Sequence, residues 1–166
     1  MIKAILACDG NYGIGKNSTL PWPHNSDDLK WFRNMTLGSV VIMGRNTWES
    51  PDMPKPLTRR INVVVSSRRD LEPRPHVITS WENLEKTLYN CSVKFGDVWI
   101  IGGGTLINSC LDLINEIHLN RFHEVYDCDT FLDIEQIEEK FDRNGDYGKI
   151  SFNKKKLKQE NSTCGL

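Results

Sequence analysis

Apolar residues in this chain form short continuous runs, and the segments between several of these runs carry apolar residues at helical spacing. A continuous run is typical of a strand that is buried on both faces of a sheet. We expect such strands at residues 2–8, 39–43, 61–65 and 98–101, and further strands at 76–78 and 116–122. Helices are expected over about ten residues from position 27, and at 45–49, 81–89 and 105–113. About four helices alternating with these strands predict an α/β fold, with a central, mainly parallel sheet and an antiparallel C-terminal edge.

Two helices carry signals at their ends. Ser26 is expected to be the N-cap of the first helix, and two aspartates then fall in its first turn, where the helix dipole favours negative charge. Gly38 is expected to end this helix, and Ser80 to cap the helix at 81–89.

The C-terminal part shows a weaker pattern. Residues 131–137 are expected to be a strand or a turn leading into one, and residues 150–152 a short edge strand. No strand pair can be recognised from Ile134 onward. We expect one domain over residues 1–153, followed by a polar, basic tail at 154–166 that frays.

Composition and charge narrow the classes of protein. A length of 166 residues favours a single domain, and a formal net charge of −1 gives no electrostatic reason to expect a nucleic-acid partner. The five cysteines are odd in number and widely spaced, which argues against a disulfide framework or a zinc site and favours a reducing cytoplasm. The N-terminal apolar run is too short to span a membrane. We expect a cytoplasmic protein, a monomer with no membrane contact.

No metal is expected either. Residues 142–146 begin like a calcium-binding loop, but its sixth position is Tyr147 instead of glycine and its twelfth is Asn153 instead of glutamate. The four histidines show no ligand spacing.

Three predicted strands end in residues suited to phosphate. The first is followed by a glycine, a cation and a hydroxyl, the second by two hydroxyls and a guanidinium, and the third by three glycines and a hydroxyl. These segments are Gly44-Arg45-Asn46-Thr47, Ser66-Ser67-Arg68 and Gly102-Gly103-Gly104-Thr105. Each alone could be a tight turn, but the carboxyl ends of parallel strands converge, so together they predict a nucleotide phosphate site. Neither a G-x-G-x-x-G fingerprint nor a Walker A loop is present.

Asp28 is the strongest candidate for a residue that binds or protonates a substrate. On the predicted helix it shares a face with Phe32, four positions on, whereas the preceding aspartate is expected to be solvated. We expect Ile5, Leu29, Phe32 and Ile101 to enclose this carboxylate. A carboxylate in an apolar pocket suits a protonated or amidine-like heterocycle, or proton transfer to one. The glycine-hinged loop at residues 13–23 comes directly before this helix and is expected to close over the site.

The motifs, in their order along the chain, resemble dihydrofolate reductase. The resemblance runs from Ile2 to Phe131 and covers nearly four fifths of the chain. The segments that carry it are Gly13-Ile14-Gly15-Lys16-Asn17, Leu20-Pro21-Trp22, Asp28-Leu29-x-Trp31-Phe32, Val41-Ile42-Met43-Gly44-Arg45-Asn46-Thr47-Trp48-Glu49-Ser50, Pro56-Leu57-x-x-Arg60-Ile61-Asn62, Ser66-Ser67 and Ile100-Ile101-Gly102-Gly103-Gly104.

The resemblance implies reduction of 7,8-dihydrofolate to tetrahydrofolate by hydride transfer from NADPH, in support of one-carbon metabolism and thymidylate synthesis. It implies that Asp28 holds the amino-pyrimidine edge of the pterin and promotes protonation of N5 through water near Trp22. It also implies that Arg60 pairs with the α-carboxylate of the glutamate tail. The implied substrate-binding residues are Ile5, Asp28, Leu29, Phe32, Leu57, Arg60, Ile101 and Asn120.

For the cofactor, the resemblance implies a 2′-phosphate site, a cis peptide at Gly102–Gly103, and a lid whose Ile14 and Leu20 close over the nicotinamide. Arg45, Ser66, Ser67 and Arg68 are implied for the 2′-phosphate. The full implied set is Ala7, Ile14, Leu20, Gly44, Arg45, Asn46, Thr47, Ser66, Ser67, Arg68, Gly102, Gly103, Gly104, Thr105 and Leu106.

Two positions depart from the family's pattern. Asn120 stands where a threonine hydroxyl usually bonds the catalytic acid, and Ile107 where bacterial members commonly have a tyrosine. An amide can still bond Asp28, so we expect altered positioning of the acid. The alternatives are a pteridine or pyrimidine reductase of the riboflavin-pathway type, and a diverged, non-catalytic NADP-binding protein.

Overall fold

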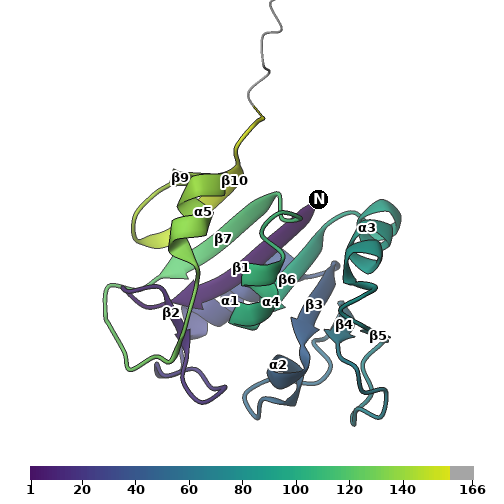
Figure 1. The fold of residues 1–166 in the computed structure, drawn as a ribbon. Coiled ribbons are helices and arrows are strands. Elements are labelled where there is room, and N and C mark those ends of the chain that lie inside the picture. Colours follow the sequence, from purple (N-terminus) through teal and green to yellow (C-terminus); the bar gives the residue numbers. More distant parts are fainter. Residues whose placement is uncertain (158–166) are drawn as a thin grey trace, which may run out of the picture.

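The computed structural model describes residues 1–157 and contains an eight-stranded sheet with the strand order β5-β4-β3-β6-β1-β7-β10-β9 (Figure 1). Neighbouring strands from β5 to β7 are parallel, and β10 pairs antiparallel with both β7 and β9. The predicted fold class is therefore confirmed. The strands are β1 (Ile2–Cys8), β3 (Val40–Gly44), β4 (Ile61–Val65), β5 (Val77–Thr79), β6 (Val98–Gly102), β7 (Glu116–Arg121), β9 (Phe141–Asn144) and β10 (Gly148–Lys154).

A second, two-stranded sheet lies beside the first. It pairs β2 (Gly13–Gly15) antiparallel with β8 (Thr130–Phe131). This small sheet joins the glycine-hinged loop after β1 to the segment that follows β7, so two stretches more than a hundred positions apart are fixed to each other.

Five helices occur in residues 1–157, one more than expected. They are α1 (Ser26–Thr36), α2 (Arg45–Glu49), α3 (Leu84–Phe95), α4 (Gly104–Ser109) and α5 (Ile134–Lys140). Figure 1 shows α4 and α5 in front of the large sheet and α1 behind it.

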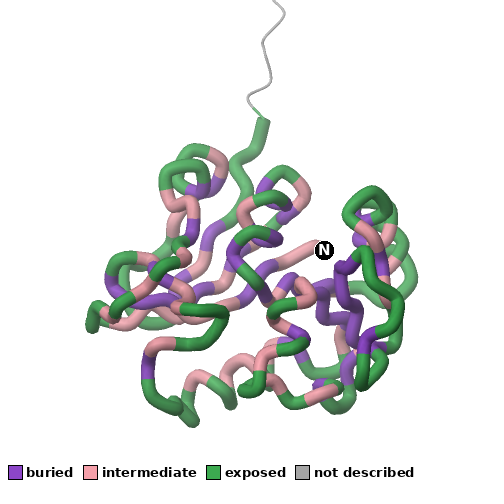
Figure 2. The backbone as a smooth tube through the Cα atoms, turned by 60° about the horizontal axis from the view of Figure 1, so that its bottom comes forward, coloured by how far each residue is buried: buried purple, intermediate pink, exposed green. Residues whose placement is uncertain are grey.

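Each face of the sheet has its own core, which explains why the central strands β3 and β6 are apolar without interruption. Ala4 and Ile42 belong to the larger cluster, which α3, α4 and α5 cover, while their neighbours Ile5 and Val41 belong to the smaller cluster under α1 and α2. Successive side chains of a strand point to opposite faces, so adjacent apolar residues enter different cores. In Figure 2 buried stretches of the backbone run through the interior, and exposed segments lie around them.

Helix starts differ from prediction at two places. The N-cap of α1 is Asn25, not Ser26, because the side chain of Asn25 accepts a hydrogen bond from the backbone N–H of Asp28 at 3.0 Å. The helix expected from position 81 begins only at Leu84 and continues to Phe95, because residues 81–83 form a turn held by the Ser80 hydroxyl. The helix expected at 105–113 is α4, which ends at Ser109 and gives way to a turn.

The C-terminal predictions were wrong in two respects. The strand expected at 131–137 is mostly helix, because Asp133 caps α5 and Ile137 is buried on its inner face. Residues 150–152 lie in β10, which is an interior strand and not an edge, since β9 pairs with it on the outer side. The strand pair that could not be recognised is therefore present as β9 and β10. The expected fraying tail starts inside β10 at Lys154, and its residues 158–166 lie outside the described part.

Within residues 1–157 the four cysteines are free thiols, and no three acidic, histidine or cysteine side chains are arranged to hold a metal ion. None of the helices in this part has the length and apolar character needed to cross a bilayer.

Candidate active site

The three glycine- and hydroxyl-rich segments meet at one edge of the sheet. They follow β3, β4 and β6, which are parallel neighbours, so Gly44, Ser66 and Gly102 lie at the same, carboxyl end. Helix α2 begins directly after Gly44, and α4 begins at Gly104. The convergence expected from the sequence is present in the structure.

The glycines at this edge have no side chains that could cover the backbone. The peptide bond between Gly102 and Gly103 is cis, as the sequence resemblance implies, and Gly102 has φ +140°. A Cβ on Gly102 would lie 3.5 Å from the Thr47 hydroxyl, and one on Gly104 would lie 2.6 Å from Cδ1 of Ile14. The edge is thus close both to the start of α2 and to the loop after β1. Leu106, in contrast, is buried in the larger core, so its side chain does not face this edge.

Of the cations expected at this edge, Arg45 is partly exposed and Arg68 is exposed, and each has one carboxylate neighbour. Nε of Arg45 lies 3.9 Å from the Glu49 carboxylate, and Arg68 makes a two-point contact with Asp70 at 3.1 and 3.2 Å. The hydroxyl of Ser66 is buried and accepts the backbone N–H of Arg68 at 3.0 Å, which shapes the turn after β4. Ser67 and Asn46 are exposed. An incoming phosphate can therefore compete for both guanidinium groups.

Asp28 lies half-buried in the first turn of α1 and faces the sheet. Nδ2 of Asn120, on β7, donates a hydrogen bond to its Oδ1 at 3.0 Å. Burial raises the pKa of the Asp28 carboxyl, and the hydrogen bond from Asn120 and the charge of Lys149 oppose that rise. The preceding Asp27 is exposed, as expected. The structure thus singles out Asp28 as the carboxylate in an apolar environment.

The apolar wall expected around Asp28 is largely assembled. Of its expected members, Ile5 on β1, Phe32 on α1 and Ile101 on β6 belong to the smaller core cluster. Leu57, from the loop before β4, belongs to the same cluster. Leu29 is 48% exposed and lies outside that cluster, so on this side the wall is open to solvent.

Arg60 is buried close to this wall. Its guanidinium lies 5.9 Å from the Phe32 ring centre, and it donates from Nε to the Thr58 carbonyl and from Nη1 to the Thr36 hydroxyl. Burial, together with the nearby charge of Arg33, lowers the pKa of Arg60.

The loop that carries Arg60 is held by Asn62, a residue to which sequence reasoning gave no role. Its side chain accepts the N–H of Leu57 and donates to the carbonyls of Leu57 and Arg60, all at 2.9 to 3.0 Å. Thr36, which bonds the Arg60 guanidinium, was also missed. The available signal was an asparagine inside the apolar run at 61–65, because an amide buried in such a strand needs hydrogen-bond partners.

The loop after β1 is anchored by a buried carboxylate. Asp9 accepts hydrogen bonds from the backbone N–H groups of Asn11, Gly13 and Tyr126, and from the thiol of Cys128. Burial by itself raises the pKa of Asp9, but these hydrogen bonds outweigh it and the pKa is lowered. Asp9 was not among the predicted site residues, yet it ties the loop to the segment after β7.

Beyond this anchor the loop reaches the site. Trp22 is 8% exposed and packs edge-on against Phe122 with ring centres 5.3 Å apart, whereas Leu20 is 51% exposed. A cavity of about 210 Å³ separates the loop from α2. Its lining residues include Asn17, Thr19, Asn46 and Glu49.

The site thus combines a glycine-rich sheet edge suited to phosphate with a carboxylate in an apolar recess. This arrangement is typical of an α/β enzyme that binds a nucleotide next to a second, smaller ligand. A sequence profile of the dihydrofolate reductase family matches residues 1–161. The chain is 38% identical over 141 residues to dihydrofolate reductase from Haemophilus influenzae, covering 83% of this chain and 84% of that protein. It is 36% identical over 147 residues to the viral dihydrofolate reductase of Saimiriine herpesvirus 2, covering 80% and 68%.

A solved structure shows the same fold. Dihydrofolate reductase from Enterococcus faecalis, complexed with NADP(H) and RAB-propyl, superposes with a TM-score of 0.79 at 23% identity, covering 94% of this chain and 97% of that one. The chain belongs to the dihydrofolate reductase family. It is an NADPH-dependent oxidoreductase that reduces dihydrofolate, which favours the first of the functions considered from the sequence.

Proposed function

We propose that Asp28 holds the amino-pyrimidine edge of the dihydrofolate pterin and promotes protonation of N5. The observation that carries this assignment is a half-buried carboxylate whose Oδ1 is already engaged by Asn120, which leaves Oδ2 for the substrate. Burial strengthens an ionic hydrogen bond to a protonated heterocycle, because fewer water molecules compete for it. Trp22 shields the approach of the water that delivers the proton.

The substrate's remaining parts lie along α1. Phe32, Leu57 and the exposed Leu29 flank the benzoyl ring, and Ile5 and Ile101 flank the pterin. Arg60 binds the α-carboxylate of the glutamate tail. Support comes from its guanidinium, which is fixed by Thr36 and Thr58 and so presents its remaining N–H groups without further ordering.

The residues at the sheet edge fit NADPH. The backbone of Gly102 and Gly103 carries no side chains and lies close to the Thr47 hydroxyl at the start of α2, so backbone N–H groups and this hydroxyl can contact a pyrophosphate together. When bound, NADPH supplies the hydride. Its 2′-phosphate is recognised by the exposed groups at the ends of β3 and β4. The residues that would hold the cofactor are Ala7, Ile14, Leu20, Gly44, Arg45, Asn46, Thr47, Ser66, Ser67, Arg68, Gly102, Gly103, Gly104 and Thr105, with Leu106 contributing only its backbone.

The loop at residues 13–23 acts as a lid. The close approach of Ile14 to Gly104 supports this role, and closure of Leu20 excludes water from the nicotinamide. We further propose a monomer that works in the cytoplasm; the four free thiols in residues 1–157 fit a reducing compartment. Residues 1–153 form the single catalytic domain.

The test compares Asp28→Asn with Asp27→Asn, which removes the same charge from the exposed neighbouring position. NADPH oxidation with dihydrofolate should fall about 10²- to 10⁴-fold in Asp28→Asn at neutral pH and change less than about twofold in Asp27→Asn. Part of the loss should return at acidic pH, where the substrate is protonated before it binds. Equal rates for Asp28→Asn and the wild type would remove the role assigned to Asp28.

A further inference from the structure

Asp70 lies in the segment after β4 and binds a guanidinium group that belongs to the predicted cofactor site. Its carboxylate accepts hydrogen bonds from Nε of Arg68 at 3.1 Å and from Nη2 at 3.2 Å. A phosphate also binds arginine through two parallel N–H groups. Both side chains are exposed to solvent, so an incoming anion can reach the pair. The carboxylate of Asp70 therefore occupies an edge of Arg68 that a phosphate would use.

A second ion pair lies at the neighbouring strand end. Gly44 and Val65 are opposite each other in the parallel pairing of β3 with β4, so the residues that follow them leave the sheet side by side. Arg45 follows Gly44, and its Nε lies 3.9 Å from the carboxylate of Glu49. Each guanidinium group expected at the 2′-phosphate thus has a carboxylate next to it.

The two ion pairs lie within electrostatic range of each other. The hydrogen bond from Arg68 lowers the pKa of the Asp70 carboxyl, and the charge of Arg45 adds to this effect. The hydrogen bond to Asp70 raises the pKa of Arg68, and the charge of Glu49 contributes to the rise. A phosphate that approaches either cation therefore also meets a negative charge.

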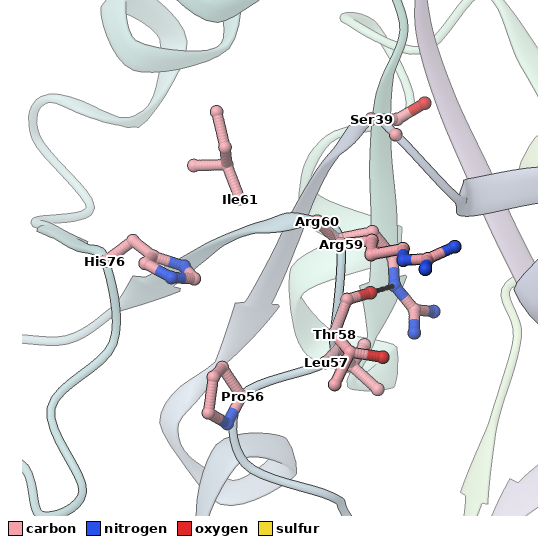
Figure 3. Close-up of a pocket in the computed structure, with 9 residues that line it drawn as sticks. Ser39, Pro56, Leu57, Thr58, Arg59, Arg60, Ile61 and His76 are labelled. Atoms are coloured by element: carbon pink, nitrogen blue, oxygen red, sulfur yellow. Dashed lines mark hydrogen bonds between the residues drawn. The ribbon is translucent and has the colours of Figure 1, made fainter.

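The opposite, amino end of β3 and β4 shows that arginines in this protein do not always have acidic neighbours. Arg59 and Arg60 line a cavity of about 390 Å³ there (Figure 3). None of the nine described residues that line this cavity carries a carboxylate. Carboxylates beside the arginines are thus a feature of the cofactor end of these two strands.

We propose that Asp70 is a specificity-determining residue of the cofactor site, whose carboxylate competes with the 2′-phosphate for Arg68 and so reduces the preference of the enzyme for NADPH over NADH. NADH has no 2′-phosphate and leaves the pair of Arg68 and Asp70 intact. NADPH contacts Arg68 only after it has broken this ion pair and has brought its phosphate close to a carboxylate. This role of Asp70 depends on the proposed placement of the 2′-phosphate beside Arg45 and Arg68.

The sign of one measurement separates competition from support. A carboxylate that orients Arg68 for the phosphate would leave NADPH more weakly bound when it is neutralised, whereas a competing carboxylate leaves it more tightly bound. Asp70→Asn suits this measurement, because asparagine has nearly the same shape and its Oδ1 still accepts a hydrogen bond from Arg68, but it carries no charge.

The test measures dissociation constants of NADPH and NADH for the wild type, Asp70→Asn, Arg68→Ala, the double variant of these two substitutions, and Glu139→Gln. Glu139 is an exposed carboxylate on α5, which packs against β9 at the other edge of the sheet, so Glu139→Gln controls for the change in net charge.

At low ionic strength Asp70→Asn should bind NADPH about threefold more tightly than the wild type, the size expected for exposed charge pairs, and NADH about equally. The gain should shrink when Arg68 is replaced by alanine and when salt is added. Glu139→Gln should bind both cofactors like the wild type.

Weaker binding of NADPH in Asp70→Asn would overturn the proposed competition and show that Asp70 orients Arg68. An equal gain for NADPH and NADH, or a gain that is undiminished in the double variant, would overturn it as well. If neither Arg45→Ala nor Arg68→Ala changes the affinity for NADPH, the proposed 2′-phosphate site itself is wrong. A loss of NADPH affinity in Arg68→Ala, with no gain in Asp70→Asn, would contradict the role of Asp70 alone.

Discussion

The side-chain amide of Asn120 donates a 3.0 Å hydrogen bond to Oδ1 of Asp28 and so joins β7 to the first turn of α1. Lys149 lies opposite Asn120 in the antiparallel pairing of β10 with β7, so the two side chains point to the same face of the sheet. His118, two residues before Asn120, also points to that face, and its ring is bonded to the Glu116 carboxylate at 3.0 Å. The acid is therefore supported by one amide from β7 and one cation from β10.

Removing either support should raise the pKa of Asp28 further. In Asn120→Ala the carboxylate loses a charge-assisted hydrogen bond, and in Lys149→Met it loses a favourable charge, so both variants favour the protonated acid. Carbon NMR of the carboxyl groups measures the shift directly, and Lys156→Met serves as a control for net charge. An unchanged titration of Asp28 in Asn120→Ala would contradict the support we assign to Asn120.

Asp28→Asn should stabilise the protein at neutral pH. Folding raises the pKa of Asp28 above 3.8, so the ionised carboxylate lowers the stability of the folded protein. This loss of stability is absent below about pH 3.8 and is complete above the folded pKa. We expect the free energy of unfolding to rise by about 1 kcal/mol at neutral pH in the variant, a gain common when a functional group is neutralised. Urea unfolding at a series of pH values checks this: the two proteins should converge as the pH falls, and a constant difference would point to another cause.

Gly13→Ala should loosen the lid, whereas Gly15→Ala should not. A Cβ on Gly13 would lie 2.5 Å from Sγ of Cys128 and 3.0 Å from Oδ1 of Asp9, so the anchor must move, while a Cβ on Gly15 would come no closer than 3.4 Å to any atom. We expect Gly13→Ala to lose about 1–3 kcal/mol of unfolding free energy and to bind NADPH less tightly. Denaturant titration and cofactor binding measure both effects. Equal behaviour of the two variants would show that this anchor does not hold the lid.

Arg45→Ala should weaken the binding of NADPH far more than the binding of NADH. Arg45 contacts Glu49 only at 3.9 Å, so its charge is available to a 2′-phosphate, which NADH lacks. We expect about a tenfold rise in the NADPH dissociation constant at low salt, with NADH changed less than about twofold. Arg68→Ala should have a smaller effect, because Arg68 is already paired with Asp70. Matched losses for the two cofactors would contradict a 2′-phosphate role.

The parts of the site that could be predicted are those formed by residues close together in the sequence. Each phosphate-suited segment directly follows an apolar strand, and parallel strands place their ends together whatever the details of packing. Asp28 could be chosen over Asp27 because helical spacing puts it on the face of Phe32. The C-terminal region was harder, because the strands β9 and β10 are rich in charged residues and α5 has only seven residues.

By itself, the sequence determined the α/β class, the phosphate-suited sheet edge and the choice of acid, because these depend on periodicity and on neighbours along the chain. Only the tertiary structure decided what surrounds them. The contact of Asn120 with Asp28 spans 92 positions, and that of Cys128 with Asp9 spans 119. The left-handed conformation of Arg59 depends on hydrogen bonds from Gly38 and on the amide of Asn62. Contacts of this kind form only when strands and loops pack together, so no local pattern records them.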